Sequence, residues 1–379
     1  MFASFLKQFD TYNDKYGVWV FYIGLVLMIV SRSWFCIDEE MPRYYYLLRW
    51  YFLCIGQLLL LIRILLFVRK YPLYVFCCII LCGLIWYSRS LSGWRFIFIS
   101  SIIIAASRDA NIKIILRIYL FAFLIISILA PTMLSIGWTG EIVKHKFGLI
   151  GHSWGFSNPN LLAFMMMLLT LLCLHYWVIK NTIVIWIICW VMAIFVWMCT
   201  LCMTSCFILL LVPILYYYLK YRPIPVQTLA LLPWICLLTS IILSCYYNPS
   251  LGETTFESRF SIPALVYQNL GLSLFGQELA NVNLGTGQTG TQLICVDNAF
   301  MHLVLCDGVI IALLFLIFLS HFLYRVGKME HPLLVSSVIG ITLTGMMENI
   351  LQDAMINFLL LYYFHQYTPL TKKSSNKVF

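Results

Sequence analysis

Long apolar runs separated by short polar stretches dominate this chain from residue 18 to residue 367. A membrane-spanning helix needs about 20 predominantly apolar residues, and runs close to that length recur along the sequence. They are 18–34, 47–68, 71–87, 94–107, 114–136, 160–179, 182–201, 206–219, 226–247, 299–323, 332–347 and 351–367. The pattern therefore predicts an all-α fold, a polytopic helical bundle of about twelve transmembrane helices. The runs 94–107, 206–219, 332–347 and 351–367 are short, which is compatible with tilted or re-entrant segments.

Two connections are much longer than the others. They cover residues 137–158 and 248–298, whereas most other connections have only a few residues, as expected between antiparallel neighbours. No internal repeat or change of composition divides the chain, so residues 1–379 are predicted to form a single membrane domain. The polar tail 368–379 is predicted to be a disordered cytoplasmic segment.

Composition supports a membrane location. Hydrophobic residues make up 62% of the chain and charged residues only 10%. A soluble domain carries about 25% charged residues. With the N-terminus inside and the sides alternating, sixteen of the 24 lysines and arginines fall on the inner side, as the positive-inside rule requires. We therefore expect a multi-pass protein of the cytoplasmic (inner) membrane with both termini inside and the two long loops extracytoplasmic. The net charge of +9 then reflects topology, and no nucleic-acid partner is expected.

Several enzyme signatures are missing from the sequence. It has no phosphate-binding Walker loop, no GxSxG nucleophile elbow, no HExxH zinc motif and no GxGxxG after a strand. No cysteine pair has CxxC spacing in a polar loop. We therefore expect no metal and no cofactor, and a reaction whose substrates reach the membrane surface. Lipid-linked substrates are the natural class.

The larger outer loop offers one cation among carboxylates. Arg259 is its only basic residue, and Glu253, Glu257 and Glu278 lie in the same loop. A guanidinium is always charged and forked, which suits it to binding a phosphate. A plain ion pair explains Arg259 equally well. The stretch around 256–270 is compatible with a helix.

The smaller outer loop is the most basic outer segment. Its sequence KHKFGLIGHSWGFSNPN covers residues 144–160 and includes Lys144 and Lys146. Asn158 is a suitable N-cap and Pro159 a suitable first residue for the helix that follows. A cap alone accounts for these two residues but not for the basic residues before them. Cations beside a helix N-terminus attract anions.

Three further ionisable residues lie at helix ends or within helices. Arg49 stands beside tyrosines and a tryptophan, so an interfacial anchor is the alternative to a binding role. Asp307 lies ten residues past Asp297, about 15 Å deeper along a helix, and an intramembrane acid is a functional candidate by default. Glu348 and Gln352 lie one turn apart in a polar hairpin, where a solvated turn is the alternative.

Some of these segments resemble a known family. GFSNPN, opening a helix at 155–160, resembles a run in Wzy-type polymerases of capsular, O-antigen and exopolysaccharides. The order SRF, LFGQEL and DNAFMHLVLCDGVI resembles the second half of the O-antigen polymerase and ligase superfamily. The membrane layout is similar along the whole chain. The motif-level likeness covers only 147–160 and 258–311.

The resemblance implies a metal-independent glycosyltransferase. Such an enzyme polymerises oligosaccharide repeat units linked to undecaprenyl pyrophosphate at the extracytoplasmic face of the membrane. A hydroxyl of one unit attacks the anomeric carbon of the next, and undecaprenyl pyrophosphate leaves. This chemistry needs cations for the pyrophosphate and a base for the hydroxyl proton. A chain-length regulator is a further partner that the resemblance suggests.

Roles follow for individual residues. By position, Arg259 matches the loop arginine and would hold the pyrophosphate, and Asp297 and Asn298 fall where the ligase branch has a His-Asn pair. Asp297 thus replaces the histidine as base, with His302 and Glu348 as the other candidates. The remaining predicted site residues are Lys144, Lys146 and Arg49 for the pyrophosphate, and Asn158, Asn298 and Asp307 for the glycan.

Three alternatives remain open. The first is an O-antigen ligase of the same superfamily. The second is another lipid-phosphate-sugar glycosyltransferase, for which Asp38, Glu39 and Glu40 in the first outer loop would be the acids. The third is a flippase for the lipid-linked glycan, although such transporters show related halves that this sequence lacks.

Overall fold

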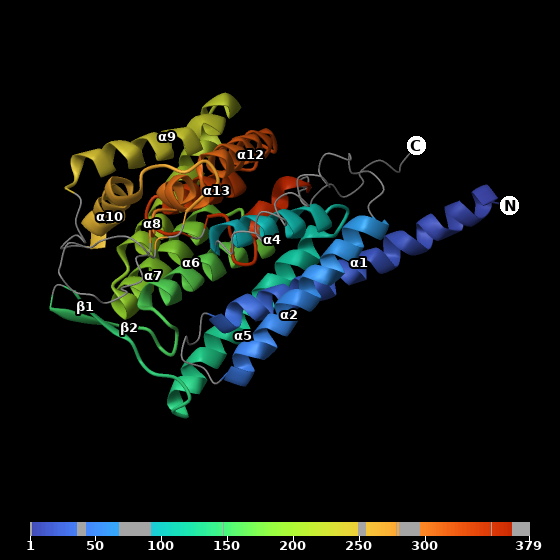
Figure 1. The fold of residues 1–379 in the computed structure, drawn as a ribbon, viewed down its shortest axis with the longest axis horizontal. Coiled ribbons are helices and arrows are strands. Elements are labelled where there is room, and N and C mark those ends of the chain that lie inside the picture. The colour runs from blue at the N-terminus through green and yellow to red at the C-terminus, as the bar shows by residue number, and fades with distance from the viewer. Residues whose placement is uncertain are drawn as a thin grey trace.

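The computed structural model describes residues 2–35, 43–67, 92–146, 148–248, 255–277, 279, 296–349 and 351–365. Within these residues the chain is almost entirely helical (Figure 1). The helices are α1 (Phe2–Phe35), α2 (Arg43–Ile62), the π-helix η1 (Arg63–Phe67), α4 (Ser92–Ala106), α5 (Ile112–Ser135), α6 (Pro159–Tyr176), α7 (Thr182–Thr200), α8 (Met203–Tyr221), α9 (Val226–Tyr246), α10 (Thr255–Leu270), α11 (Ala299–His302), the π-helix η3 (Leu303–Asp307), α12 (Val309–Lys328), α13 (Pro332–Thr344) and the 3₁₀ helix η4 (Phe358–Tyr363).

Among the described residues, seven helices are long and apolar enough to cross a membrane. They cover Leu47–Leu65, Ile112–Ser135, Pro159–Tyr176, Thr182–Thr200, Met203–Tyr221, Val226–Tyr246 and Val309–Lys328. Shorter apolar helices cover Tyr16–Arg32, Ile97–Ala106 and Pro332–Thr344. The prediction of an all-α protein with several helices long and apolar enough to span a membrane is confirmed at this level. The predicted span 71–87 and the acids Asp38, Glu39 and Glu40 lie outside the described residues.

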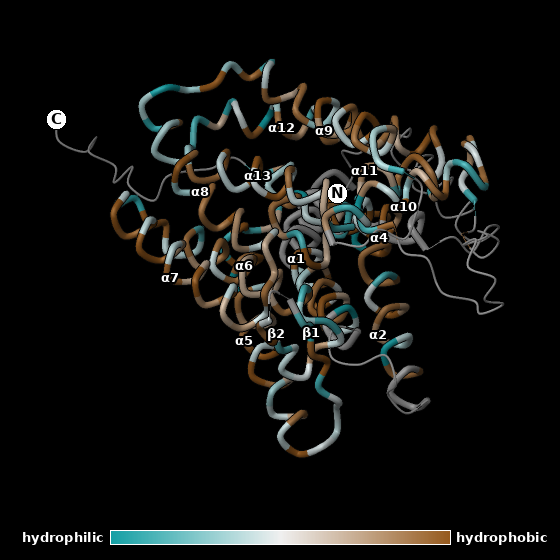
Figure 2. The backbone as a smooth tube through the Cα atoms, turned by 90° about the vertical axis from the view of Figure 1, so that its left-hand side faces the viewer, coloured by the Kyte–Doolittle hydropathy of each residue, from teal (hydrophilic) through white to brown (hydrophobic). Residues whose placement is uncertain are grey.

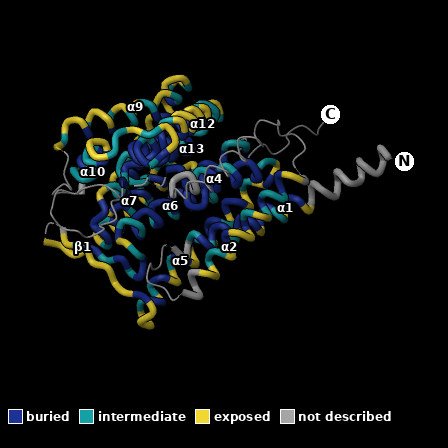
Figure 3. Tube along the Cα trace, viewed as in Figure 1, coloured by how far each residue is buried: buried dark blue, intermediate teal, exposed yellow. Residues whose placement is uncertain are grey.

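The helices differ in how much of their surface the protein covers. In α6 67% of the apolar window is buried, whereas in α7 only 22% is buried. The uncovered side chains are large and apolar, for example Ile183, which is 68% exposed. Exposed faces of this kind lie on the outside of the bundle (Figure 3), where lipid is the solvent that suits them. Figure 2 shows α9 and α12 on one side of the bundle, α5 on the other, and α6, α8 and α13 between them.

Asparagine caps start several of the helices. Asn111, Asn158 and Asn181 each accept a hydrogen bond from the backbone N–H two residues further on. Pro159 occupies the first turn of α6, where its missing N–H costs nothing. The predicted cap at Asn158 and Pro159 is therefore confirmed. The helix predicted around 256–270 is also present, as α10.

The predicted helix 299–323 is not continuous. It divides into α11, η3 and α12 at Gly308, which has a φ of 100°. A Cβ at Gly308 would collide with Gly276 and with the carbonyl oxygen of Leu274, 2.7 Å away, because the segment after α10 runs against the break. Backbone hydrogen bonds from Gln277 to Cys306 and from Val309 to Ser273 join the two segments. Asp307 and Gly308 are the local sign of this interruption in the sequence, but the partner that requires the break belongs to the preceding loop.

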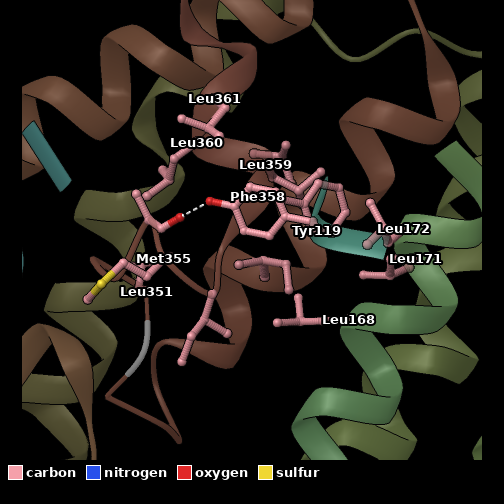
Figure 4. Close-up of a cluster of buried hydrophobic side chains, with 14 of the residues drawn as sticks. Tyr119, Leu168, Leu171, Leu172, Leu351, Met355, Phe358, Leu359, Leu360 and Leu361 are labelled. Atoms are coloured by element: carbon pink, nitrogen blue, oxygen red, sulfur yellow. Dashed lines mark hydrogen bonds between the residues drawn. The ribbon is translucent and has the colours of Figure 1, made fainter. Parts of the chain in front are cut away.

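The prediction of a helix over 351–367 is wrong. This segment forms turns and the 3₁₀ helix η4, and its residues from Leu351 to Tyr362 are buried. Side chains from other helices take up its backbone groups: Ser100 accepts from the N–H of Ala354 at 2.8 Å, and the Tyr119 hydroxyl donates to the carbonyl of Ala354. Figure 4 shows Tyr119 beside Phe358 and close to the leucines of α6. Irregular backbone inside an apolar bundle requires such partners.

The first long loop contains a small hairpin that was not predicted. Strands β1 (Val143–Lys146) and β2 (Leu149–His152) pair antiparallel, with Lys144 opposite Gly151. Gly151 lies against the end of α7: a Cβ added there would be 2.6 Å from the carbonyl oxygen of Thr200. This close approach fixes the position of the hairpin, and with it the position of Lys144, relative to the end of α7.

We expect Gly151→Ala to destabilise the protein by about 1–3 kcal/mol, the usual cost of overpacking. The backbone carbonyl of Thr200 cannot move aside, so the hairpin must shift. The matched control is Gly140→Ala, because a Cβ at Gly140 has no neighbour within 4 Å. Thermal unfolding of the purified proteins in detergent measures the difference. Equal melting temperatures for the two variants would contradict the packing of β2 on α7.

Candidate functional site

A pocket of about 120 Å³ lies where the first long loop, the second long loop and the turn after α13 meet. Its lining consists of Asn158, Asn160, Leu161, Phe164, Arg259, Asp297 and Glu348. Four of these seven residues, namely Asn158, Arg259, Asp297 and Glu348, are predicted site residues. They come from segments that are far apart in the sequence.

Arg259 is the centre of the pocket. Its side chain is only 6% exposed, and one guanidinium nitrogen forms an ion pair with the carboxylate of Asp297. The second terminal nitrogen donates to the carboxylate of Glu348 at 3.3 Å. A buried cation is stable only when charge partners replace its lost water. The two carboxylates therefore determine where the guanidinium lies.

The position of α10 is fixed on its other side by aromatic packing. Phe260, the neighbour of Arg259, is 1% exposed and stacks on Tyr247 at the end of α9, with ring centroids 6.1 Å apart and planes 14° apart. Phe256 packs edge-on against Phe260 at 5.3 Å. These contacts set the rotation of α10 about its axis and so direct Arg259 into the pocket.

Glu348 is the more enclosed of the two acids. It lies in the turn after α13, and its side chain is 19% exposed, against 38% for Asp297. Burial raises the pKa of the Glu348 carboxyl, and the charges of Arg259 and Lys144 offset part of that effect. Glu348 is therefore a better proton acceptor than an ordinary glutamate, and Asp297 is the acid on the more open side.

Lys144 approaches the pocket from the hairpin. Its ammonium donates to the side-chain oxygen of Asn160 at 3.3 Å. Asn160 in turn lines the pocket at the start of α6. The structure thus brings Lys144 to the edge of the site, where its charge acts on Glu348. Lys146 is on the same strand, but its side chain lies outside the described residues.

Two of the predicted asparagines cap helices. The side-chain oxygen of Asn158 accepts from the N–H of Asn160 at 2.8 Å, so part of its polar capacity is used within α6. Asn298 is fully buried: its oxygen accepts from two N–H groups of α11, and its amide donates to Ser240 at 3.0 Å. Asn158 still lines the pocket, whereas Asn298 is not among the lining residues.

The remaining predicted residues are not brought to the pocket. His302 and Asp307 form a separate buried pair on the broken helix, with Nδ1 of His302 3.4 Å from the Asp307 carboxylate. Arg49 lies on α2, where its backbone oxygen accepts from Ser31 of α1. Of the three base candidates, Asp297 and Glu348 therefore line the pocket and His302 does not.

One ion pair that shapes the same region could not be predicted from the sequence. Arg32 of α1 donates to the carboxylate of Asp353 at 2.7 Å, and the two side chains are 12% and 3% exposed. The residues are 321 positions apart, so no local pattern links them. The bond ties the turn region after α13, which carries Glu348, to the first helix. Leu161 and Phe164 were also missed as lining residues, because apolar positions in a membrane helix carry no distinguishing signal.

Comparison with family models, with curated proteins and with solved structures gives no match. Among the described residues, no three His, Cys, Asp or Glu side chains are grouped so that they could hold a metal ion. The chemistry of this site thus has to be inferred from its own cations and carboxylates.

We expect Arg259→Met to lower stability more at pH 8 than at pH 5. Without the guanidinium the pKa of Glu348 in the folded protein rises further. A carboxyl with a raised pKa in the folded state contributes its full stability only below its unfolded pKa, and that contribution is lost as the pH rises through the folded pKa. The loss at pH 8 should be about 3 kcal/mol, the lower end for breaking a buried pair. Thermal unfolding against pH is the measurement.

Arg259→Met/Glu348→Gln should recover part of this loss, since no buried charge then remains at Glu348. Arg325→Met, which removes a cation far from the pocket, should show no such pH dependence. A double variant no more stable at pH 8 than Arg259→Met would show that the two side chains are not coupled.

Proposed function

We propose that this chain polymerises oligosaccharide repeat units carried on undecaprenyl pyrophosphate, at the outer face of the cytoplasmic membrane. The observation that carries the proposal is the pocket in which Arg259 lies between Asp297 and Glu348, with Lys144 at its edge. The family resemblance of the segments at 147–160 and 258–311 supports it, because the pocket is built from these two segments and the turn after α13.

The residues fit the balance of charge in such a transfer. A hydroxyl oxygen of one unit forms a bond to the anomeric carbon of the next, and the bond from that carbon to the pyrophosphate oxygen breaks. The leaving pyrophosphate gains the electron pair, and Arg259 and Lys144 would stabilise its charge. The hydroxyl proton would pass to a carboxylate, for which Glu348 is suited by its raised pKa.

Asp297 would have a different role in the proposed transfer. It pairs with Arg259 from the more exposed side of the pocket. A phosphate entering from that side would compete with the Asp297 carboxylate for the guanidinium fork. Asp297 would then orient Arg259 in the free protein and become available as a second proton acceptor when phosphate is bound.

The location of the pocket suits a lipid-anchored substrate. Its lining comes partly from the first turns of α6, a membrane-spanning helix by length and composition, and includes the apolar side chains Leu161 and Phe164. A lipid pyrophosphate lies at headgroup depth, where the end of such a helix also lies. The substrate would therefore reach Arg259 without leaving the bilayer.

A flippase for the same lipid-linked glycan is the second candidate. The observation that favours it is the break at Gly308 beside the buried Asp307, because transporters often place polar residues at broken helices. Asp307 and its partner His302 do not line the pocket, and the charged lining belongs to the Arg259 site. The enzyme is thus the better supported function.

Arg259→Ala should abolish the ladder of long glycans in cells while single repeat units are still made and displayed. The reason is loss of the charge that holds the leaving group. Arg259→Lys should recover only part of the ladder, because an ammonium lacks the bidentate fork. Electrophoresis of surface glycans, with protein abundance measured in parallel, checks this.

Arg117→Ala is the control, since Arg117 is exposed and donates to Tyr176 away from the pocket. A normal ladder from Arg259→Ala at normal abundance would assign Arg259 to structure alone. Long glycans stranded on lipid would indicate a ligase, and glycans trapped inside the cell a flippase.

The proposed orientation predicts a labelling pattern. In a cysteine-free background, His145→Cys should react with a membrane-impermeant thiol reagent added to intact cells, whereas Lys180→Cys should not. Both positions are exposed, so burial does not mask either. Labelling of position 180 in intact cells would reverse the orientation and place the pocket on the cytoplasmic side.

A further inference from the structure

A second charged corner lies at the ends of α7 and α8, away from the pocket. The hydroxyl of Tyr216 on α8 donates to the backbone oxygen of Lys180, just before α7, at 3.0 Å. The ammonium of Lys220 donates to the hydroxyl of Thr182 at 3.2 Å. These two bonds hold the connection before α7 against the end of α8. Lys180 and Lys220 therefore lie at one corner, with Arg222 two residues beyond.

The sequence around this corner is rich in cations and poor in acids. The side chains of Lys180, Lys220 and Arg222 are exposed, and the sequence from 142 to 252 contains no Asp or Glu. Two other connections each contain an acid: Asp109 lies between α4 and α5, and Glu330 between α12 and α13. Lys180, Lys220 and Arg222 together carry a formal charge of about +3 at physiological pH.

His331, the N-cap of α13, interacts with Lys180 and adds no charge to the corner. Burial, assisted by the charge of Lys180, lowers the pKa of His331 to about 4. His331 is consequently neutral at physiological pH.

The helices that carry the corner have large apolar side chains on their uncovered faces. On α7, Ile183 is 68% and Ile187 57% exposed, one turn apart on the same face. On α8, Tyr217 is 53% and Tyr221 65% exposed, and Lys220 lies 5.9 Å from the Tyr221 ring. Since α7 and α8 pack together as antiparallel neighbours, these faces continue from the cations into the membrane region. Figure 2 shows the two helices together at one edge of the molecule.

We propose that this corner binds an anionic phospholipid, with the phosphate held by Lys180, Lys220 and Arg222 and the acyl chains lying on the exposed faces of α7 and α8. Each lysine or arginine near an anionic membrane surface strengthens the attraction. Arg222 supplies a forked donor and the lysines supply point charges, a combination suited to phosphate oxygens. The apolar faces below the cations select a lipid over a free phosphate. This inference is independent of the proposed enzyme function.

The test uses the purified full-length chain in neutral detergent, with phosphatidylglycerol as the anionic probe and phosphatidylcholine as the neutral one. Native mass spectrometry counts bound lipids over a range of lipid concentrations. The variant is Lys180→Gln/Lys220→Gln/Arg222→Gln. The matched control is Lys113→Gln/Arg325→Gln/Lys328→Gln, which removes the same charge elsewhere; Arg325 and Lys328 already lie over the rings of Tyr363 and Tyr324.

We expect phosphatidylglycerol to bind the wild type and the control with similar affinity. The corner variant should bind it roughly 100-fold more weakly, about fivefold for each cation lost. Binding of phosphatidylcholine should be weak and equal in all three. Lys220→Arg/Arg222→Lys keeps both charges, so it should bind like the wild type. Lys220→Gln alone should bind about fivefold more weakly, which tests the corner if the triple variant does not fold.

Other outcomes would overturn the inference. Equal loss in the corner variant and the control would show that overall charge, and no particular corner, attracts the lipid. Equal binding of phosphatidylcholine and phosphatidylglycerol would show that only apolar contact matters. Full competition by soluble glycerol phosphate would identify a phosphate site with no part for the acyl chains.

Discussion

The pairing of buried Arg259 with Asp297 and Glu348 is the interaction on which the site depends. The Arg259 guanidinium is almost fully enclosed and cannot shed its proton, so the protein has to supply negative charge around it. The two carboxylates that do so come from the segment before α11 and the turn after α13. One cation therefore fixes the relative positions of three segments, and the start of α6 with the hairpin closes the pocket around them.

Irregular backbone within the bundle makes this arrangement possible. The chain breaks at Gly308 and follows turns from residue 351 onward, and both departures would be costly in an apolar setting without partners. Residues 273–277 provide hydrogen-bond partners for the backbone at the Gly308 break. Ser100 and Tyr119 provide partners for the backbone of the turns after residue 351. Because Glu348 lies between α13 and the second irregular stretch, its place depends on these long-range bonds as well as on Arg259.

The sequence predicts the regular helices and their caps well, but it predicts contacts between distant positions poorly. The membrane-spanning helices α5, α6, α7 and α9 and the cap at Asn158 follow from local runs and local cap chemistry. The break at Gly308 and the turns after 351 do not, because both runs are mostly apolar and the partners that hold their irregular backbone lie elsewhere in the chain. Arg259 and Glu348 were separate candidates from charge and position alone. Their contact, between positions far apart in the chain, carries no local signal.

The most direct test of the central claim is the binding of undecaprenyl pyrophosphate to the purified protein in the presence of EDTA. Arginine and lysine hold the pyrophosphate in this account, so binding should persist without divalent metal and weaken as salt screens the charges. Undecaprenyl monophosphate, with less negative charge, should bind less tightly, and Arg259→Ala should bind the two lipids equally weakly. Tight binding by Arg259→Ala, or binding that requires added magnesium, would contradict the assignment of this pocket.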